Sequence, residues 1–486
     1  MFRLRRDVYW DNNATTAPSK AVVREMVRVL EHVHGNPSSP HRAAHDARTV
    51  LERSRQTVAR TIGADSAQIH FCGSATEATN QILRSVVASS GGVCRILSSP
   101  VEHHAVLRTL EAMAAEGVEV ELLAVDERGL VREDSLVRAL ERPAHLVCIL
   151  RVNNETGAIQ DVARLAGVAH AHGALVFSDC VQALGKIPVD VRALGIDYAV
   201  VASHKIHGPK GIGALWAREG APLVAQVHGG AQEGGLRAGT EALHDIAGFA
   251  EACRNLTKSI DQASMVASVM EQFLSGLRAL FPEAVEAVPA SLRVANTAMV
   301  RFPGVPNGVL MGWLDLRGIR VSAGSACATD EDLPSHVLMA QGWTPDQARE
   351  ALRFSLDTTL PERVLRSQAE QVLGALKAYR DGKSSSMELL RGAEVAALLA
   401  DPRTQVVDMR SAMDRKLIPP FPGAFLAGAH PWEKLPDLPR GRRLVVVCQA
   451  GFEAPVMAWR LKRAGHDPVS VVIGGMVACK LAGVVG

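Results

Sequence analysis

The sequence predicts an α/β protein in which helices cover a mostly parallel sheet. Through the first 250 residues, short apolar runs alternate with longer amphipathic stretches, the pattern of parallel strands joined by helices. Polar side chains follow the ends of successive predicted strands, where open α/β sheets bind their ligands. At 486 residues the chain is too long for one domain, so two or three domains are expected.

Each strand of the predicted large sheet is an apolar run of about four to eight residues bounded by small or polar residues. The predicted strands are residues 69–72, 95–98, 145–152, 174–178, 198–202 and 212–216. Amphipathic stretches such as 76–88 and 163–172 supply the helices between them. Beyond this sheet, a long helical segment leads to strands at 294–302 and 318–322 and then to further helices. That order predicts a smaller α+β unit.

A polar stretch at residues 381–386 divides the chain. Its Gly and Ser content is typical of a flexible linker, and new strands are predicted after it at 405–408, 443–448 and 468–473. The remaining residues are enough for an independent domain. We therefore predict four parts: a large domain at about 15–250, a small domain formed by the N-terminal segment plus about 251–380 (together residues 1–380), the linker 381–386, and a C-terminal domain at 387–486.

Charge and composition exclude several classes of protein. The chain has 53 basic and 51 acidic residues, a net charge of +2, so we expect neither nucleic acid nor a membrane surface as a partner. No apolar stretch approaches the length of a membrane span, and no apolar region of a signal peptide follows the charged N-terminus. We expect a cytoplasmic protein. The eight cysteines are scattered without a C-x-x-C pair, which argues against disulfides and against a metal site.

Lys205 is the most informative residue. It follows the apolar run 198–202 and precedes a Gly-Pro pair, and a lysine held at a strand end can lose its proton and form a Schiff base with a carbonyl group. A solvated loop lysine is the alternative. Asp179 ends another apolar run. A lysine for the aldehyde and a carboxylate for the pyridine nitrogen are what pyridoxal phosphate requires, so the pair predicts this cofactor.

Other polar groups also lie just past predicted strand ends. Residues 73–80 place small and hydroxyl side chains at the start of a helix, which favours an anion at the helix N-terminus, although an ordinary Ser/Thr cap has the same pattern. The flat ring of His103 is suited to stack on a cofactor, although a lone histidine is more often structural. Asn154 and Gln182 follow further strand ends. Together these groups predict one ligand site.

The first 380 residues resemble the cysteine desulfurases, fold-type I pyridoxal phosphate enzymes of the class V aminotransferase group. The matching segments, which occur in order, are residues 9–16, 35–39, 73–77, 102–103, 152–157, 179–182, 203–211, 237–240, 322–327 and 353–356. The resemblance implies a fold-type I transferase with pyridoxal 5'-phosphate as cofactor and L-cysteine as substrate. It also implies a homodimer.

The resemblance further implies a role for each matching site residue. Around the cofactor ring, Lys205 would be the Schiff-base lysine, Asp179 the partner of the pyridine nitrogen, His103 the stacking and catalytic residue, and Gln182 the contact of the phenolic oxygen. The phosphate would be held by Thr76 and His204, with Thr240 reaching the neighbouring subunit's cofactor. Ala75 and Ser203 would be further cofactor-binding residues. Asn154 would contact both cofactor and substrate. Arg353 would grip the substrate carboxylate, for which a guanidinium fork is suited.

A second chemical centre is predicted at residues 322–330. Gly, Ser and Ala predict a mobile loop, and a cysteine in such a loop is a candidate nucleophile. The resemblance implies that Cys327 attacks the substrate sulfur, which leaves alanine and a persulfide on Cys327. The spacing from Cys327 to Arg353 resembles the longer-loop branch associated with iron–sulfur cluster assembly and general sulfur supply.

One position departs from the family pattern. A serine that binds the phosphate is usual three residues before the Schiff-base lysine, whereas this chain has Ala202. Either the hydroxyl of the neighbouring Ser203 substitutes for it, or the phosphate loses one contact. We expect weaker cofactor retention rather than loss of activity.

The C-terminal hundred residues resemble a rhodanese-like domain. The matching segments are 406–410, 422–424 and 446–454, and in that fold backbone N–H groups converge on the sulfur of the loop cysteine, here Cys448. Glu453 and Ala454 replace the frequent arginine and serine. A carboxylate near the thiol raises its pKa and repels anionic donors such as thiosulfate. We therefore expect Cys448 to receive sulfur from Cys327, the alternative being a domain used for docking.

Three classes of function follow from these patterns. The first is a cysteine desulfurase that passes sulfur to an unidentified acceptor protein for iron–sulfur cluster, thio-cofactor or tRNA biosynthesis. The second is another pyridoxal phosphate reaction, such as selenocysteine lysis or transamination. The loop cysteine argues against plain transamination but not against selenocysteine lysis. The third is a scaffold whose C-terminal domain binds a partner while catalysis is secondary.

Overall fold

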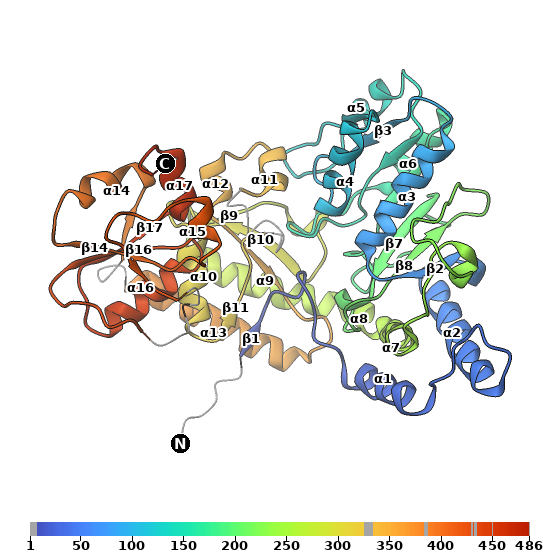
Figure 1. The fold of residues 1–486 in the computed structure, drawn as a ribbon, viewed down its shortest axis with the longest axis horizontal. Helices are drawn as coiled ribbons and strands as arrows, with labels where there is room; N and C mark the ends of the chain where they lie inside the picture. The colour runs from blue at the N-terminus through green and yellow to red at the C-terminus, as the bar shows by residue number, and fades with distance from the viewer. Residues whose placement is uncertain are drawn as a thin grey trace.

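The computed structural model describes residues 7–324, 334–382, 387–428, 431, 435–449 and 451–485, with residues 257 and 258 described by their backbone. In these described residues the strands form four sheets, of seven, three, two and five strands. Figure 1 shows the seven-stranded sheet at one end of the molecule, the five-stranded sheet at the other, and the smaller sheets between them. No described helix is both long and apolar enough to cross a bilayer.

The seven-stranded sheet has the order β2-β8-β7-β6-β5-β3-β4. Its strands are β2 (Ile69–Cys72), β3 (Arg95–Ser98), β4 (Glu119–Leu122), β5 (Leu146–Cys148), β6 (Leu175–Asp179), β7 (Tyr198–Ala202) and β8 (Gly213–Ala217). β8 is antiparallel to both of its neighbours, whereas the other pairs are parallel. The predicted α/β class is therefore confirmed, and the large sheet is mixed, with parallel pairs in the majority.

Helices cover both faces of this sheet, because its side chains alternate between two apolar cores. On β3, Ile96 packs with α3 and α4, whereas Leu97 belongs to the core built with α1, α2, α5, α6 and α7. The helices are α1 (Lys20–His32), α2 (Arg42–Thr61), α3 (Ala75–Ser89), α4 (His104–Ala115), α5 (Glu133–Ala139), α6 (Val162–Ala171) and α7 (Leu243–Arg254).

Six of the seven strands of the sheet were predicted, and β2, β3 and β7 have the predicted bounds. The run 145–152 forms a strand over Leu146–Cys148 alone, after which the chain enters the turn that carries Asn154. β4 was not predicted, since its sequence Glu-Val-Glu-Leu is half-exposed and lies at the sheet edge. An edge strand lacks the continuous apolar run that marks a buried one.

The start of α3 is held against β8 by a close backbone approach. Ser74 caps the helix by accepting a hydrogen bond from the backbone N–H of Glu77. A Cβ added at Gly213 on β8 would lie 2.9 Å from the backbone nitrogen of Ala75. Glycine at this position therefore lets the N-terminus of α3 lie beside the ends of the central strands.

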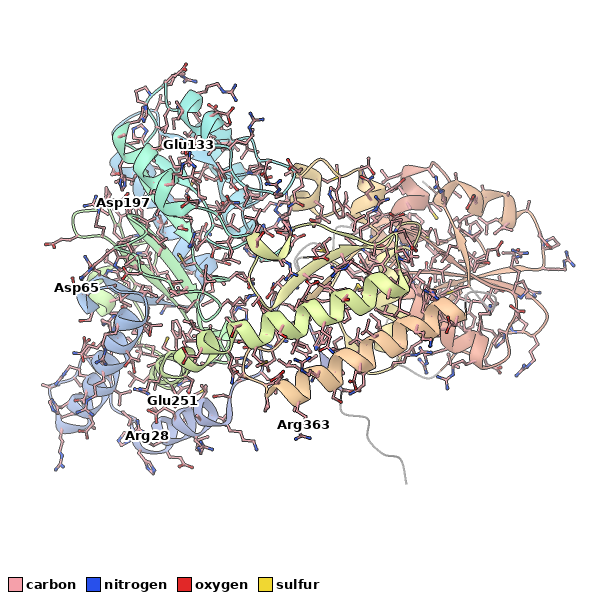
Figure 2. The ribbon with its side chains drawn as sticks, turned by 180° about the vertical axis from the view of Figure 1, so that it is seen from behind. Arg28, Asp65, Glu133, Asp197, Glu251 and Arg363 are labelled. Carbon is pink, nitrogen blue, oxygen red and sulfur yellow. The ribbon has the colours of Figure 1, made fainter. Side chains whose placement is uncertain are left out.

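A smaller unit follows α7 and includes the N-terminal strand. β10 (Thr297–Arg301) is antiparallel to β9 (Val285–Glu286) and β12 (Ala351–Ser355), and β1 (Val8–Tyr9) pairs with β11 (Ile319–Arg320). Figure 2, the view from behind, shows the long helices α9 (Ala263–Leu280) and α13 (Glu362–Asp381) side by side at the front. The remaining helices are α8 (Leu256–Asp261), α10 (Asn307–Asp315), α11 (His336–Ala340) and α12 (Pro345–Ala348).

The C-terminal residues form a parallel sheet of their own, ordered β13-β17-β16-β14-β15. Its strands are β13 (Glu388–Leu390), β14 (Thr404–Asp408), β15 (Phe425–Leu426), β16 (Arg443–Val447) and β17 (Val469–Val472). Its helices are α14 (Gly392–Leu399), α15 (Asp414–Leu417), α16 (Ala454–Arg463) and α17 (Gly475–Leu481). This unit contacts the smaller one where α16 packs on α10.

Candidate active site

A cavity of about 540 Å³ opens at the carboxyl ends of β6 and β7, beside the first turn of α3. Such a crevice at strand ends is the usual ligand site of an open α/β sheet. The predicted site residues that line it together are Ala75, Thr76, His103, Asn154, Asp179, Gln182, His204, Lys205 and Arg353. Elements far apart in the chain therefore contribute to one site.

Lys205 ends the short 3₁₀ turn that follows β7. Its Nζ donates hydrogen bonds to the backbone carbonyl oxygens of Asn13 and Ala14, each at 2.7 Å. The ammonium group is thus held inside the cavity by the N-terminal segment. The sequence predicted the lysine but not these two partners.

Asp179, the last residue of β6, is buried at the end of the cavity. Burial raises the pKa of Asp179 to about 6, an effect that the backbone N–H of Val181 and the charge of Lys205 partly offset. A carboxylate in so dry a place is most stable beside a cationic partner. A protonated ring nitrogen of a ligand would provide that partner.

Two histidines of the cavity are kept neutral. Burial, assisted by the charge of Lys205, lowers the pKa of His103 and of His204 to about 4. His103 caps α4, its Nδ1 accepting from the backbone N–H of Ala105 at 3.1 Å. The opposite ring nitrogen, Nε2, then carries the proton. A neutral imidazole with this fixed tautomer can stack on an aromatic ring without repelling the nearby lysine.

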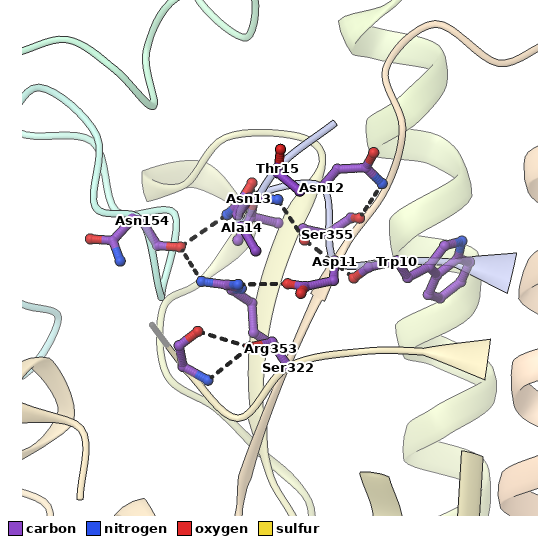
Figure 3. Close-up of polar contacts among 12 residues, drawn as sticks. Trp10, Asp11, Asn12, Asn13, Ala14, Thr15, Asn154, Ser322, Arg353 and Ser355 are labelled. Atoms are coloured by element: carbon purple, nitrogen blue, oxygen red, sulfur yellow. Dashed lines mark hydrogen bonds and ion pairs between the residues drawn. The ribbon is translucent and has the colours of Figure 1, made fainter. Parts of the chain in front are cut away.

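Arg353 lies on β12 and is 1% exposed. Its Nη1 donates to the backbone carbonyl oxygen of Asn154 at 2.9 Å, and its Nη2 donates to Oδ1 of Asp11 at 2.7 Å, as Figure 3 shows. Its backbone pairs in both directions with Ser322. Its Nε has no hydrogen-bond partner among the described residues, so the fork keeps donors for an incoming carboxylate.

Asn13 connects the N-terminal segment to the rest of the site. Its Nδ2 donates to the carbonyl oxygen of Asn154 at 3.1 Å, and its backbone N–H donates to Oγ of Ser355 (Figure 3). The same Nδ2 donates to Oγ1 of Thr297 at 3.0 Å. Neither Asp11 nor Asn13 was singled out from the sequence. The one signal that could have identified them is the match of residues 9–16 to the resembled family.

Cys327 lies outside the described residues, but both flanks of its segment contact the turn that carries Asn154. Oγ of Ser335 donates to Oε2 of Glu155 at 2.5 Å. A Cβ at Gly324 would lie 3.0 Å from the same oxygen. Gly324 and Ser335 therefore both lie beside the turn whose Asn154 lines the cavity.

Three other predicted site residues do not line the cavity. The Oγ of Ser203 points at Gly208, where an added Cβ would lie 2.0 Å away. Thr240 is exposed on the surface. Cys448 directly follows β16 of the C-terminal sheet and is 1% exposed. Its sulfur accepts from the backbone N–H groups of Gly451 and Ala454, yet burial raises its pKa to about 11.

The cavity fits pyridoxal phosphate. Inside it, Oδ1 of Asn154 and Oγ1 of Thr79 are buried without hydrogen-bond partners in the described parts of the chain, and such atoms normally meet a ligand or water. The first turn of α3 offers backbone N–H groups to a phosphate, Asp179 suits a pyridine nitrogen, and Lys205 suits an aldehyde.

Residues 8–362 match the family model described as aminotransferase class-V. The chain belongs to this family. It is 36% identical over 355 residues to the cysteine desulfurase IscS of Dictyoglomus turgidum, covering 73% of this chain and 90% of the relative. It is 37% identical over 416 residues to a cysteine desulfurase of Frankia sp., covering 79% of this chain and 98% of that one. Pyridoxal 5'-phosphate is the cofactor of this family and therefore of this enzyme.

Solved structures agree with the fold. A NifS-like protein superimposes with a TM-score of 0.71 at 33% identity, covering 77% of this chain and 99% of its own. The structure of SspA in complex with cysteine superimposes with a TM-score of 0.63 at 29% identity, covering 72% of this chain and 98% of that one. The class V aminotransferase has the fold-type I architecture, and the family match ends before the C-terminal sheet.

Proposed function

We propose that this enzyme converts L-cysteine to L-alanine and holds the released sulfur as a persulfide on Cys327. The carbon–sulfur bond of the substrate breaks, its sulfur bonds to the Cys327 sulfur, and the protons of the two thiols remain on alanine and on the persulfide. The observation that carries the proposal is one cavity that joins Lys205 and Asp179 to a carboxylate-binding fork on Arg353. The desulfurase relatives support it.

Each residue has a task that follows from its surroundings. Bound pyridoxal phosphate supplies an electron sink for the substrate carbons. Lys205, which lines the cavity, holds and moves protons at Nζ, and Asp179 would keep the ring nitrogen protonated. Neutral His103 stacks on the ring and offers Nε2 for proton exchange. Gln182, which lines the cavity, would contact the phenolic oxygen.

Substrate orientation depends on Arg353. Its guanidinium is fixed by Asp11 and by the carbonyl of Asn154, so little rotational entropy remains to be lost when a carboxylate binds. The amide Oδ1 of Asn154 remains for the substrate or the cofactor. The flanks of the Cys327 segment lie beside this turn, which supports delivery of the Cys327 thiol to the substrate sulfur.

Phosphate binding is proposed at the first turn of α3, through Ala75 and Thr76, with His204 opposite. Ser203 contributes little there because its hydroxyl faces Gly208. We further propose a homodimer in the cytoplasm, in which the exposed Thr240 reaches the partner subunit's cofactor. That contact would supplement a phosphate site that lacks one hydroxyl, because Ala202 stands where the family usually has a serine.

The decisive experiment measures alanine and sulfide release from L-cysteine under a reducing agent. We expect equal amounts of both products, with loss of turnover in Lys205→Ala and loss of sulfide transfer in Cys327→Ala. A protein that turns over selenocysteine but not cysteine would instead be a selenocysteine lyase. Turnover of cysteine that survives in Cys327→Ala would contradict the persulfide step.

For the C-terminal residues 387–486 we propose a rhodanese-like domain, separated from residues 1–380 by the linker 381–386. Support comes from its parallel sheet and from Cys448 at the end of β16, where N–H groups of the following loop surround the sulfur. A sulfur relay from Cys327 to Cys448, onward to an acceptor protein for iron–sulfur cluster, thio-cofactor or tRNA synthesis, is one use of such a domain.

The contact between α10 and α16 favours the docking alternative for this domain. Trp313 and Trp459 stack edge to face with ring centroids 5.0 Å apart, and the loop after Cys448 packs on Gly308. A buried thiol with a pKa of about 11 is a poor nucleophile at neutral pH. Relay through Cys448 therefore requires that its buried sulfur become exposed.

Mass spectrometry after incubation with L-cysteine separates the two uses. A persulfide on Cys448 that disappears in Cys327→Ser would support the relay. Persulfide on Cys327 alone, with normal sulfide release, would support docking.

A further inference from the structure

Lys186 is a buried lysine for which neither the sequence patterns nor the proposed reaction has a use. It lies after β6, is 9% exposed, and is not among the residues that line the cavity. Burial lowers the pKa of Lys186 well below its usual value, and the charges of Lys205 and Arg353 add to the shift. A lysine in such a place needs a strong local reason, because it is costly to desolvate.

The Nζ of Lys186 has two oxygen partners. It donates to Oδ1 of Asn13 at 2.6 Å and to Oε1 of Gln182. Two donors satisfy both oxygens whether the amine is charged or neutral. Both partners line the cavity, so Lys186 is placed to act on the cavity through them.

The amide of Gln182 is fixed from both ends. Its Nε2 donates to the backbone carbonyl oxygen of Asn13 at 2.8 Å, and its Oε1 accepts from Lys186. A flipped amide would place oxygen against the carbonyl oxygen and NH₂ against the lysine donors, so both contacts would become unfavourable. The orientation of this side chain therefore follows from its neighbours.

We propose that Lys186 is a positioning residue that holds the Gln182 amide with its second N–H facing the cavity. Gln182 then presents a hydrogen-bond donor to the ligand and keeps its own oxygen turned away. The ligand group selected there is an ionised oxygen on an aromatic ring. The inference rests on the proposed contact between Gln182 and the phenolic oxygen of pyridoxal phosphate.

The test measures cofactor binding, by titrating cofactor-free enzyme with pyridoxal phosphate, and the pH midpoint of the bound cofactor's absorbance. Lys186→Met keeps the length of the side chain and removes its donors. We expect about a tenfold rise in the dissociation constant, the scale of one lost hydrogen bond in a buried site, and a shifted absorbance midpoint. Lys186→Arg retains donors and should recover most of the binding.

A double-mutant cycle separates positioning from a general structural role. In a Gln182→Ala background, Lys186→Met should have little further effect on binding or on the absorbance midpoint. A full tenfold loss in that background would overturn the inference, because Lys186 would then act by another route. Parent-like binding by Gln182→Ala would also overturn it, since Gln182 would not contact the cofactor.

Gln182→Glu tests the same idea with Lys186 intact, should Lys186→Met not fold. Its carboxylate presents an acceptor to the ring oxygen, so cofactor binding should fall below that of Gln182→Ala. Equal or tighter binding would contradict the proposal. Alanine release by the parent enzyme is measured separately, so a failure of the proposed reaction is distinguishable from a failure of this orientation.

Discussion

Arg353 donates a hydrogen bond from Nη2 to Oδ1 of Asp11 at 2.7 Å, across 342 positions of sequence. The arginine is 1% exposed and the aspartate 21% exposed, so the pair neutralises a guanidinium that would otherwise be buried with its full charge. The substrate carboxylate must therefore join a fork that already has one anionic partner. Asp11 therefore stabilises the ligand-free site, and it lowers the affinity of Arg353 for the substrate carboxylate.

Asp11→Asn should destabilise the ligand-free enzyme by about 1–3 kcal/mol, because it leaves a buried charge without its anion. A bound carboxylate should recover part of that loss. We expect L-alanine to raise the melting temperature of Asp11→Asn more than that of the parent. An equal shift in both proteins would mean that Asp11 and the ligand carboxylate do not share Arg353.

Arg353→Lys should raise the KM for L-cysteine by at least about tenfold with a smaller change in kcat. A lysine supplies a point charge but not the planar fork that Asp11, Asn154 and a carboxylate share. Steady-state alanine formation checks the split between KM and kcat. A fall in kcat at unchanged KM would place the arginine in the chemical step instead.

Asp179→Asn should stabilise the cofactor-free enzyme in a pH-dependent way. The folded-state pKa of about 6 lies above the ordinary 3.8, so the folded protein binds the proton more tightly and loses stability as pH rises through this window. The Asn variant lacks that loss. We expect nearly equal unfolding free energies at pH 4 and an advantage of about 2–3 kcal/mol for the variant at pH 7.5.

Chemical denaturation of the cofactor-free parent and variant checks this difference at each pH. The depressed pKa values of His103 and His204 give the opposite trend, stability rising from about pH 4 to 6.5, but they contribute to both proteins and largely cancel. The holoenzyme should show the reverse preference, since the variant loses the partner of the ring nitrogen. A constant difference across pH would contradict the raised pKa.

Ala202→Ser should tighten pyridoxal phosphate binding, by about tenfold for one hydroxyl that donates to a charged phosphate. Ala202 lines the cavity beside Lys205, so the added hydroxyl would face the ligand. Titration of the cofactor-free variant measures the change. Binding no tighter than that of the parent would show that the phosphate does not lie at this position.

Gly308→Ala should expose Cys448. A Cβ at Gly308 on α10 would lie 2.8 Å from the carbonyl oxygen of Gly451, so the C-terminal domain must shift. We expect iodoacetamide to modify Cys448 about tenfold faster or more, since alkylation requires access to the thiolate. Gly374→Ala on α13, where an added Cβ meets no atom of the described residues within 4 Å, is the matched control. Equal rates in both variants would contradict a covering role for α10.

Much of the large sheet could be predicted from the sequence. β2, β3 and β7 have the predicted bounds. A strand that is buried on both faces is a continuous apolar run, and small or polar residues mark its ends. Lys205 and Asp179 were found for the same reason, as polar residues within three positions of the ends of such runs. The edge strand β4 and the short β5 were less predictable, since exposure and a following turn weaken the apolar signal.

The sequence by itself determined six of the seven strands of the large sheet, and that a lysine and an aspartate stand at the ends of two of them. The tertiary structure alone decided that Asp11 pairs with Arg353, that Asn13 and Lys186 fix Gln182, and that α10 covers the loop of Cys448. The physical reason is the sequence separation of the interacting residues. Periodicity and strand ends are local properties, whereas these contacts join segments that meet when separately formed units pack, and no local pattern records which partner a buried polar group will find.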